Sequence, residues 1–421
     1  MTFSWFTLIF LAVISLTLML RYWLSFRQVR FVAAHRETVP AAFAERISLE
    51  AHQKAADYTT AKQSLMRLEI AVDTVILLVW TLGGGLALLM RVTSTLPALW
   101  NDVVLIVLVS LIGSVLTLPI SYYATFGVET RFGFNRATRL LWATDLIKGV
   151  LIGLVIGVPL LALLLWLMRT AGVYWWIWAW AVWMAFQLIM LVLYPTIIAP
   201  LFNKFKPLPE GETRNRIENL LQRCGFTANG LFVMDGSRRS GHGNAYFTGM
   251  GKTKRVVFYD TLLERLNDDE IEAVLAHELG HFKRHHIKKR IVFSAFLSLA
   301  IFALLAWLMK QTWFFTGLGI PTAVLPEALA RSGVVLSLFL LVLPTFAFLL
   351  TPLSAAYSRR HEFEADAFAA AQALPESLIN ALVRLYEDNA STLTPDPVHS
   401  SFYDSHPPAA VRIAHLQRLK T

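Results

Sequence analysis

The sequence predicts a mainly α-helical, polytopic membrane protein with about seven transmembrane helices and a polar part that contains a small β-hairpin or sheet. Of its 421 residues, 56% are hydrophobic and only 16% are charged, and the mean hydropathy is +0.52. This composition is too apolar for a soluble protein and is typical of a chain with several membrane spans. Because there is only one cysteine, Cys224, an internal disulfide framework and a cysteine-based zinc site are excluded.

The first apolar run, residues 3–20, has no basic region before it and no small-residue cleavage site close behind it. We therefore expect an uncleaved membrane helix rather than a signal peptide. The tryptophans that begin the fifth run suit an interfacial belt, and Pro344 predicts a kink in the seventh. The six later runs are residues 70–90, about 103–123, 149–168, 173–194, 291–309 and about 334–353.

These spans divide the chain into four segments. Residues 1–200 hold spans one to five, 201–290 the first polar part, 291–353 spans six and seven, and 354–421 the second polar part with the C-terminal tail. The basic loops and both polar parts fall on one side, which the positive-inside rule places in the cytoplasm. The net charge of +9 is then explained by lysine and arginine facing anionic lipid, so the expected partner is the bilayer and not nucleic acid.

The first polar part contains the motif His277-Glu278-Leu-Gly-His281. On an α-helix the two histidines lie on one face, one turn apart, where a single metal ion can bridge them. Glu278 points about 100° away, so it can act on water rather than bind the metal. This is the arrangement of zinc peptidases, with histidine ligands and a glutamate base, and it predicts one Zn²⁺ per chain. A chance match on an amphipathic helix is the alternative.

A catalytic zinc ion needs a third protein ligand. His285 continues the same helical face but lies about 12 Å along the axis from the first motif histidine, too far for one straight helix to supply all three ligands. We therefore expect His285 and His286 at the surface or the membrane interface. Glu362 and Asp366 share a helix face in the second polar part, and two spans return them to the same side of the membrane. The alternative for them is a solvated acidic helix paired with neighbouring arginines.

Several motifs together resemble the Ste24-type CAAX prenyl proteases, which are M48 zinc metallopeptidases. The resemblance implies zinc on His277, His281 and Glu362, with Glu278 as the catalytic base. It also implies that Asp366 orients the site or donates a proton. The matching segments are residues 277–281 (HELGH), 358–366 (SRRHEFEAD), 240–249 (SGHGNAYFTG), 194–205 (YPTIIAPLFNKF) and 405–407 (SHP).

Two further features are interpreted through this resemblance. His406 and Arg412 match tail residues that lie near the zinc, where a cation could stabilise the oxyanion of the tetrahedral intermediate. Residues 244–248 and 255–259 read as two strands around a glycine-containing turn, and an edge strand can bind an extended peptide by main-chain pairing. The resemblance assigns that role to Asn244 and Ala245, whereas an ordinary hairpin is the alternative.

The expected function is that of a membrane-embedded zinc metalloendopeptidase acting on a peptide or lipidated protein, in the manner of an enzyme that removes the C-terminal tripeptide from prenylated proteins. The expected location is a bacterial inner membrane, or the endoplasmic reticulum membrane of a eukaryote, with the catalytic site on the cytoplasmic side. The resemblance further implies that the helices surround a large chamber. The sequence makes no prediction of oligomeric state.

Three alternatives are weighed against this function. A broad-specificity quality-control metallopeptidase that does not need prenylation would share every motif. An intramembrane-cleaving metalloprotease is disfavoured, because basic residues between Lys283 and Arg290 separate the motif from span six. A non-enzymatic seven-span receptor or transporter would respond to a small ligand and bind no metal.

Overall fold

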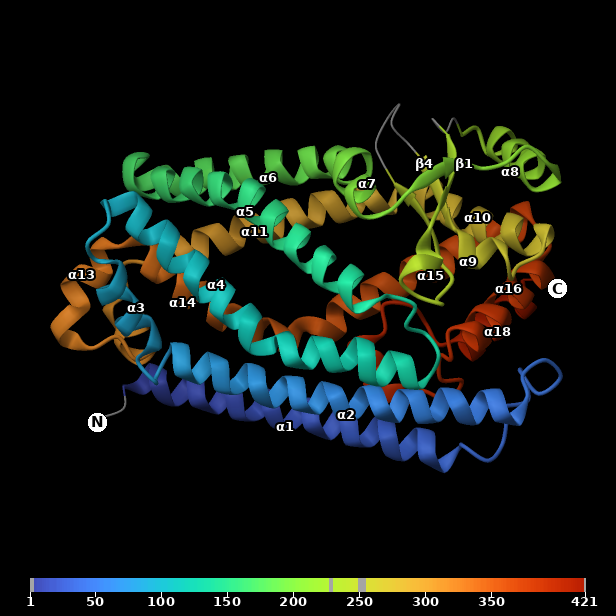
Figure 1. Ribbon diagram of the computed structural model, residues 1–421, viewed down its shortest axis with the longest axis horizontal. Coiled ribbons are helices and arrows are strands. Elements are labelled where there is room, and N and C mark those ends of the chain that lie inside the picture. The colour runs from blue at the N-terminus through green and yellow to red at the C-terminus, as the bar shows by residue number, and fades with distance from the viewer. Residues whose placement is uncertain (1–3, 227–229, 249–254, 420–421) are drawn as a thin grey trace.

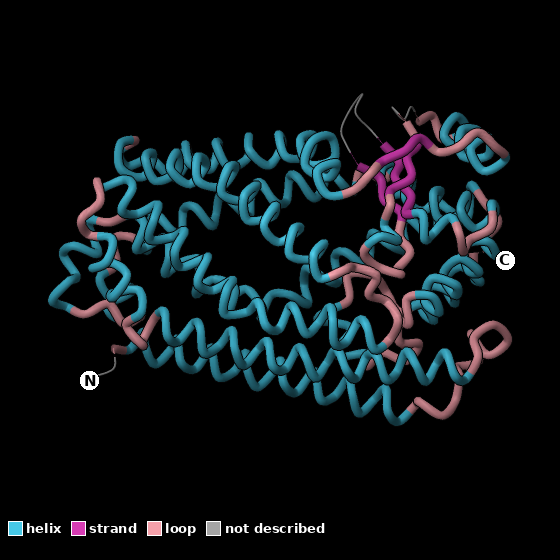
Figure 2. Tube along the Cα trace, in the orientation of Figure 1, coloured by secondary structure: helices cyan, strands magenta, loops and turns pink. Residues whose placement is uncertain are grey.

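The computed structural model describes residues 4–226, 230–248 and 255–419, and Figure 1 shows an elongated molecule. A bundle of long helices forms most of its length, and the small sheet lies with shorter helices at one end (Figures 1 and 2). The long helices are α1 (Trp5–Ala34), α2 (Leu49–Trp80), α4 (Ala98–Tyr123), α5 (Arg139–Thr170), α6 (Trp175–Leu193), α11 (His286–Leu308) and α14 (Ser332–Ala347). Among the described residues, six helical runs are long and apolar enough to cross a membrane. The predicted fold class is confirmed.

The predicted second span, residues 70–90, is wrong as one straight helix. Helix α2 ends at Trp80, and α3 (Gly85–Thr93) follows at an angle of 54°, so the pair makes a seventh span only if the two are counted together. The break falls in a run of three glycines. Gly84 has a φ of +77°, a conformation that costs glycine little. A Cβ on Gly83 would lie 2.9 Å from backbone atoms of Val79.

The seventh span continues directly into the polar part of the protein. Pro344 lies inside α14, and a short 3₁₀ turn (Phe348–Leu350) joins α14 to α15 (Thr351–Gln372). The whole run has 41 residues, about 60 Å at 1.5 Å per residue, which is roughly twice the thickness of a hydrocarbon core. Helix α15 therefore carries its C-terminal half beyond the bundle.

Shorter elements complete the chain. In the bundle these are α3, α12 (Thr312–Gly317) and α13 (Leu325–Ala330), with π-helical turns at Ala124–Glu129 and Tyr194–Ile198. In the polar part they are α7 (Ala199–Phe202), α8 (Glu212–Arg223), α9 (Asp260–Leu263), α10 (Asp268–Lys283), α16 (Pro375–Asp388), α17 (Pro397–Tyr403) and α18 (Ala409–Arg418). The bundle and the polar part each have their own cluster of buried apolar side chains.

The sheet has four strands in the order β1 (Phe205–Pro207), β2 (Leu231–Met234), β4 (Arg255–Tyr259) and β3 (Ala245–Thr248). Strands β2 and β4 are parallel, and β3 pairs antiparallel with β4, with Ala245 opposite Phe258. The predicted strand pair is confirmed, and the predicted turn between its strands lies outside the described residues. Strand β3 forms one edge of the sheet.

Helix α10 begins with strong local signals. The Asn267 side chain accepts a hydrogen bond from the Glu270 backbone, and the Glu270 carboxylate accepts one from the Asn267 backbone. This capping box satisfies two free N–H groups, and acidic residues in the first turn complement the helix dipole. The helix then packs more extensively against α15 than against any other described element. That crossing brings together two segments about 85 residues apart in the sequence.

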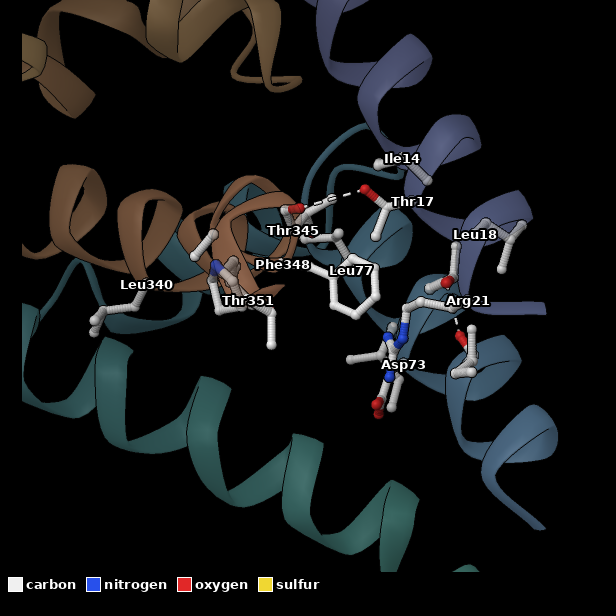
Figure 3. Close-up of a pocket in the computed structure, with 16 residues that line it drawn as sticks. Ile14, Thr17, Leu18, Arg21, Asp73, Leu77, Leu340, Thr345, Phe348 and Thr351 are labelled. Atoms are coloured by element: carbon white, nitrogen blue, oxygen red, sulfur yellow. Dashed lines mark hydrogen bonds between the residues drawn. The ribbon is translucent and has the colours of Figure 1, made fainter. Parts of the chain in front are cut away.

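A separate pocket of about 660 Å³ lies in the bundle between α1, α2 and α14 (Figure 3). Its lining is largely apolar but includes Arg21 and Asp73, and the Arg21 guanidinium lies 5.6 Å from the centre of the Phe348 ring. Of the two charged side chains that line the pocket, Arg21 is half-buried and Asp73 is exposed.

Candidate active site

Three side chains converge where α10 crosses α15. The Nε2 atoms of His277 and His281 are 3.3 Å apart, and they lie 3.3 and 3.4 Å from the two carboxylate oxygens of Glu362. Zinc ligands at about 2.0–2.2 Å in tetrahedral geometry are separated from one another by about 3.3–3.6 Å. Within residues 4–226, 230–248 and 255–419, this is the one group of three or more histidine, cysteine, aspartate or glutamate side chains whose spacing could hold a metal ion.

The chemistry of the cluster also fits a cation. The Glu362 side chain is 5% exposed, and its Oε2 atom lies 3.3 Å from Nε2 of His277 and 2.7 Å from Nδ1 of His406. A buried carboxylate is costly unless positive charge lies beside it, so this side chain favours a cation at the cluster. Two imidazole nitrogens that face the same point are explained by a shared ion, because each can then contribute a lone pair.

A buried carboxylate orients the first histidine. Nδ1 of His277 lies 2.8 Å from Oδ1 of Asp366, which is fully buried. The Arg412 guanidinium donates two hydrogen bonds to the same carboxylate, at 2.9 and 2.5 Å. Because the His277 Nδ1–H is directed at Asp366, the lone pair on Nε2 faces the cluster.

Metal binding at this site would displace a proton. Burial and the Arg412 charge lower the pKa of His277, but hydrogen bonds to Asp366 and Glu362 outweigh them and raise it to about 9. Burial and the charge on His277 lower the pKa of His281 to about 3. Because the pKa of His277 is raised and the pKa of His281 is lowered, a metal ion at this site would compete with a proton on His277.

The other candidate residues line one pocket beside this cluster. The pocket has a volume of about 310 Å³ and lies between β3, α10, α16 and the C-terminal tail. Burial raises the pKa of Glu278 inside it. A carboxylate with a raised pKa is suited to exchanging protons near neutral pH. The predicted site residues that line it are Asn244, Ala245, His277, Glu278, His406 and Arg412.

Strand β3 presents its start to the same pocket. The Asn244 carbonyl accepts a hydrogen bond from the Tyr259 backbone, and the Asn244 side chain accepts one from the Ala245 N–H, at 2.8 Å. Both residues line the pocket, and β3 is an edge strand. A strand edge of this kind is a place where an extended peptide can add by main-chain pairing.

The C-terminal tail also reaches the cluster. Nδ1 of His406 lies 2.7 Å from Oε2 of Glu362, and its side chain is 61% exposed. The Arg359 guanidinium, on α15, donates to the backbone carbonyls of Ser400, Ser401 and Asp404 at 2.9–3.3 Å. Arg359 thus holds the end of α17 against α15. The sequence suggested for Arg359 only the alternative role of an ion-pair partner for nearby carboxylates, because a hydrogen bond to a backbone carbonyl cannot be recognised from composition.

The expectation for the two later histidines is half wrong. Helix α10 ends at Lys283, and His285 adopts a left-handed conformation with a φ of 59°, so it does not continue the helical face. His285 is exposed, as predicted, but His286 is 3% exposed and lies 3.0 Å from the ring of His281. A straight-helix extrapolation could not foresee this break in the helix.

Comparisons with known proteins point in one direction. Residues 28–204 match the family described as CAAX prenyl protease N-terminal, five membrane helices, and residues 207–420 match peptidase family M48. The chain is 40% identical over 298 residues to CAAX prenyl protease 1 homolog of Arabidopsis thaliana, covering 70% of this chain and 68% of that protein. It is 31% identical over 424 residues to the Caenorhabditis elegans homolog, covering 94% of this chain and 93% of that protein. The crystal structure of S. mikatae Ste24p superposes with a TM-score of 0.90 at 30% identity, covering 98% and 99% of the two chains.

Proposed function

The chain belongs to peptidase family M48 and is a membrane-embedded metallopeptidase, and from that premise we propose that it uses one zinc ion to cleave the C-terminal peptide from prenylated proteins. The observation that carries the proposal is the triangle of His277, His281 and Glu362, whose edges of 3.3–3.4 Å are those of a tetrahedral zinc site. Zinc bound there would polarise the scissile carbonyl and lower the pKa of water at the site.

The side chains of this pocket have separate roles in the proposal. Glu278 takes a proton from the attacking water and returns it to the leaving amine, for which its raised pKa is suited. His406 is exposed at the edge of the cluster and can donate to the developing oxyanion. Arg412 donates hydrogen bonds to Asp366, so it fixes the orientation of His277 through that carboxylate and adds positive charge near the cluster.

The substrate class rests on the relatives, whose names describe CAAX prenyl proteases. The edge of β3 would receive the substrate backbone beside the cluster. We place the site on the cytoplasmic side, because the basic loops of the chain lie on the side of both polar parts. This is also the side on which prenylated proteins would meet the membrane.

Cleavage of two matched peptides by the detergent-purified protein tests the proposal. One peptide carries a farnesylated cysteine followed by three residues and the other is identical but unprenylated, and mass spectrometry locates the cut. We expect faster cleavage of the farnesylated peptide, after the modified cysteine, and none by the Glu278→Gln protein. Equal rates would favour a broad-specificity metallopeptidase, and no cleavage of either peptide by zinc-loaded protein would contradict the proposal.

A further inference from the structure

We propose that His286 and Glu364 form a hydrogen-bonded chain that orients the ligand His281, so that the first residue of membrane helix α11 helps to build the metal site. The inference rests on the proposed zinc site. Its basis is geometric, because Nδ1 of His286 lies 3.0 Å from Nδ1 of His281, and Nε2 of His286 lies 3.0 Å from a carboxylate oxygen of Glu364.

The direction of each hydrogen bond follows from the metal-binding geometry. His281 offers the lone pair of Nε2 to the cluster, so its Nδ1 carries the hydrogen and donates to Nδ1 of His286. That nitrogen must then be an acceptor, so the hydrogen of a neutral His286 is on Nε2. From there it is donated to Glu364, which accepts. Every donor in the chain meets an acceptor, with His281 in the tautomer that zinc requires.

The surroundings hold His286 in this position. Its ring is 3% exposed and stacks on His361 with the ring centres 4.0 Å apart and the planes 11° apart. The left-handed His285 separates α10 from α11, and the next side chain, His286, lies against His281 of α10. A left-handed non-glycine residue is uncommon, and it is tolerated where the surrounding packing fixes it.

The chain ends in charged groups that remain accessible to solvent. The Glu364 side chain is 31% exposed and lies 3.8 Å from Nζ of Lys289 and 3.5 Å from Nε of Arg360. The two ligand histidines are therefore oriented by different helices: Asp366 of α15 holds His277, whereas His286 at the start of α11 holds His281. A shift of α11 relative to α10 would thus turn a metal ligand.

Metal affinity tests the positioning role separately from catalysis. The purified full-length protein is titrated with Zn²⁺ against a chromophoric chelator, and its Co²⁺ form is examined by visible absorption. His286→Phe keeps an aromatic ring but removes both nitrogens, and we expect zinc affinity to fall about 10–100-fold and the Co²⁺ bands to change. His286→Asn keeps an acceptor near the Nδ1 position and should recover part of the affinity. The matched control is His285→Asn, which tolerates the left-handed turn and should leave both readouts unchanged.

Each outcome decides the inference. If folded His286→Phe binds zinc as tightly as the parent protein, with the same Co²⁺ spectrum, the inference is wrong. If that variant does not fold, Glu364→Leu supplies the test, because it breaks the second hydrogen bond at a half-buried position, and unchanged affinity would again overturn the inference. Failure of the parent protein itself to bind one zinc would instead contradict the proposed function.

Discussion

Gly280 is the position where one added methyl group would test the α10–α15 crossing most severely. It lies within the motif helix, on the face that packs against α15. A Cβ built at this glycine would be 2.9 Å from Cα of Ala365, 3.0 Å from its carbonyl oxygen and 3.2 Å from Cβ of Phe368. Two of these three contacts are with backbone atoms, so no side-chain rotation can relieve them.

The size of the effect follows from these distances. Ordinary contacts begin at 3.4 Å, so the helices must separate by about 0.5 Å at this point. Overpacking of this kind costs about 1–3 kcal/mol, and alanine returns up to about 1 kcal/mol in helix propensity. We therefore expect Gly280→Ala to lower the free energy of unfolding by up to about 2 kcal/mol. The same displacement exceeds the tolerance of about 0.2 Å for metal–ligand distances, so zinc affinity should fall at least about tenfold.

Chelator competition and thermal unfolding of the purified protein measure both effects. Gly153→Ala is the matched control, because Gly153 is also inside a helix, α5, and a Cβ there would meet nothing within 4 Å. The control should bind zinc normally and unfold at the parent temperature or slightly above it. Gly280→Ala protein with parent zinc affinity and parent stability would refute the reasoning that this glycine sets the distance between the ligands.

Four further predictions concern the site. Glu278→Gln should keep zinc and lose peptide cleavage, which metal analysis and a peptide assay would show; substantial turnover would remove Glu278 as the base. Burial raises the pKa of Glu278. Its ionised form therefore destabilises the folded, zinc-free protein at pH values above the ordinary glutamate pKa. Glu278→Gln should therefore raise the unfolding temperature at pH 8, and this gain should vanish near pH 4. Glu362→Ala should lower zinc occupancy to well below one per chain, and unchanged zinc content would exclude it as a ligand. Arg412→Met should lower the free energy of unfolding by about 3–5 kcal/mol, because it leaves the Asp366 carboxylate buried with a single partner. Thermal unfolding would contradict this if Arg412→Met destabilised the protein less than Asp366→Leu does.

Hydropathy was a sufficient guide to most of the bundle. Apolar runs long enough to span a bilayer depend on local composition, so the predicted spans coincide with parts of α1, α4, α5, α6, α11 and α14. The break at residues 81–84 was missed because a run of glycines changes hydropathy little, although it permits a left-handed turn at Gly84. Helix ends such as Ala34 were also missed, because a helix can continue past the hydrocarbon region where hydropathy no longer signals it.

Some features of the candidate site could be predicted from the sequence, and others could not. Ligand spacing within α10 is fixed by helix geometry, so a face shared by His277 and His281 could be predicted from four-residue spacing alone. Contacts that depend on tertiary packing could not. Arg359 donates hydrogen bonds to backbone carbonyls, and His286 is buried just after the helix breaks at His285. Neither contact has a periodic or compositional signal in the sequence.

X-ray absorption at the zinc edge of the purified protein tests the central claim most directly. The account predicts one zinc per chain, with two imidazole nitrogens and one or more oxygen donors at about 2.0–2.2 Å. It also predicts that Glu362→Ala reduces the bound metal while the helical content is retained. Protein that folds and contains no stoichiometric zinc, or zinc with sulfur ligands or a single imidazole, would contradict it.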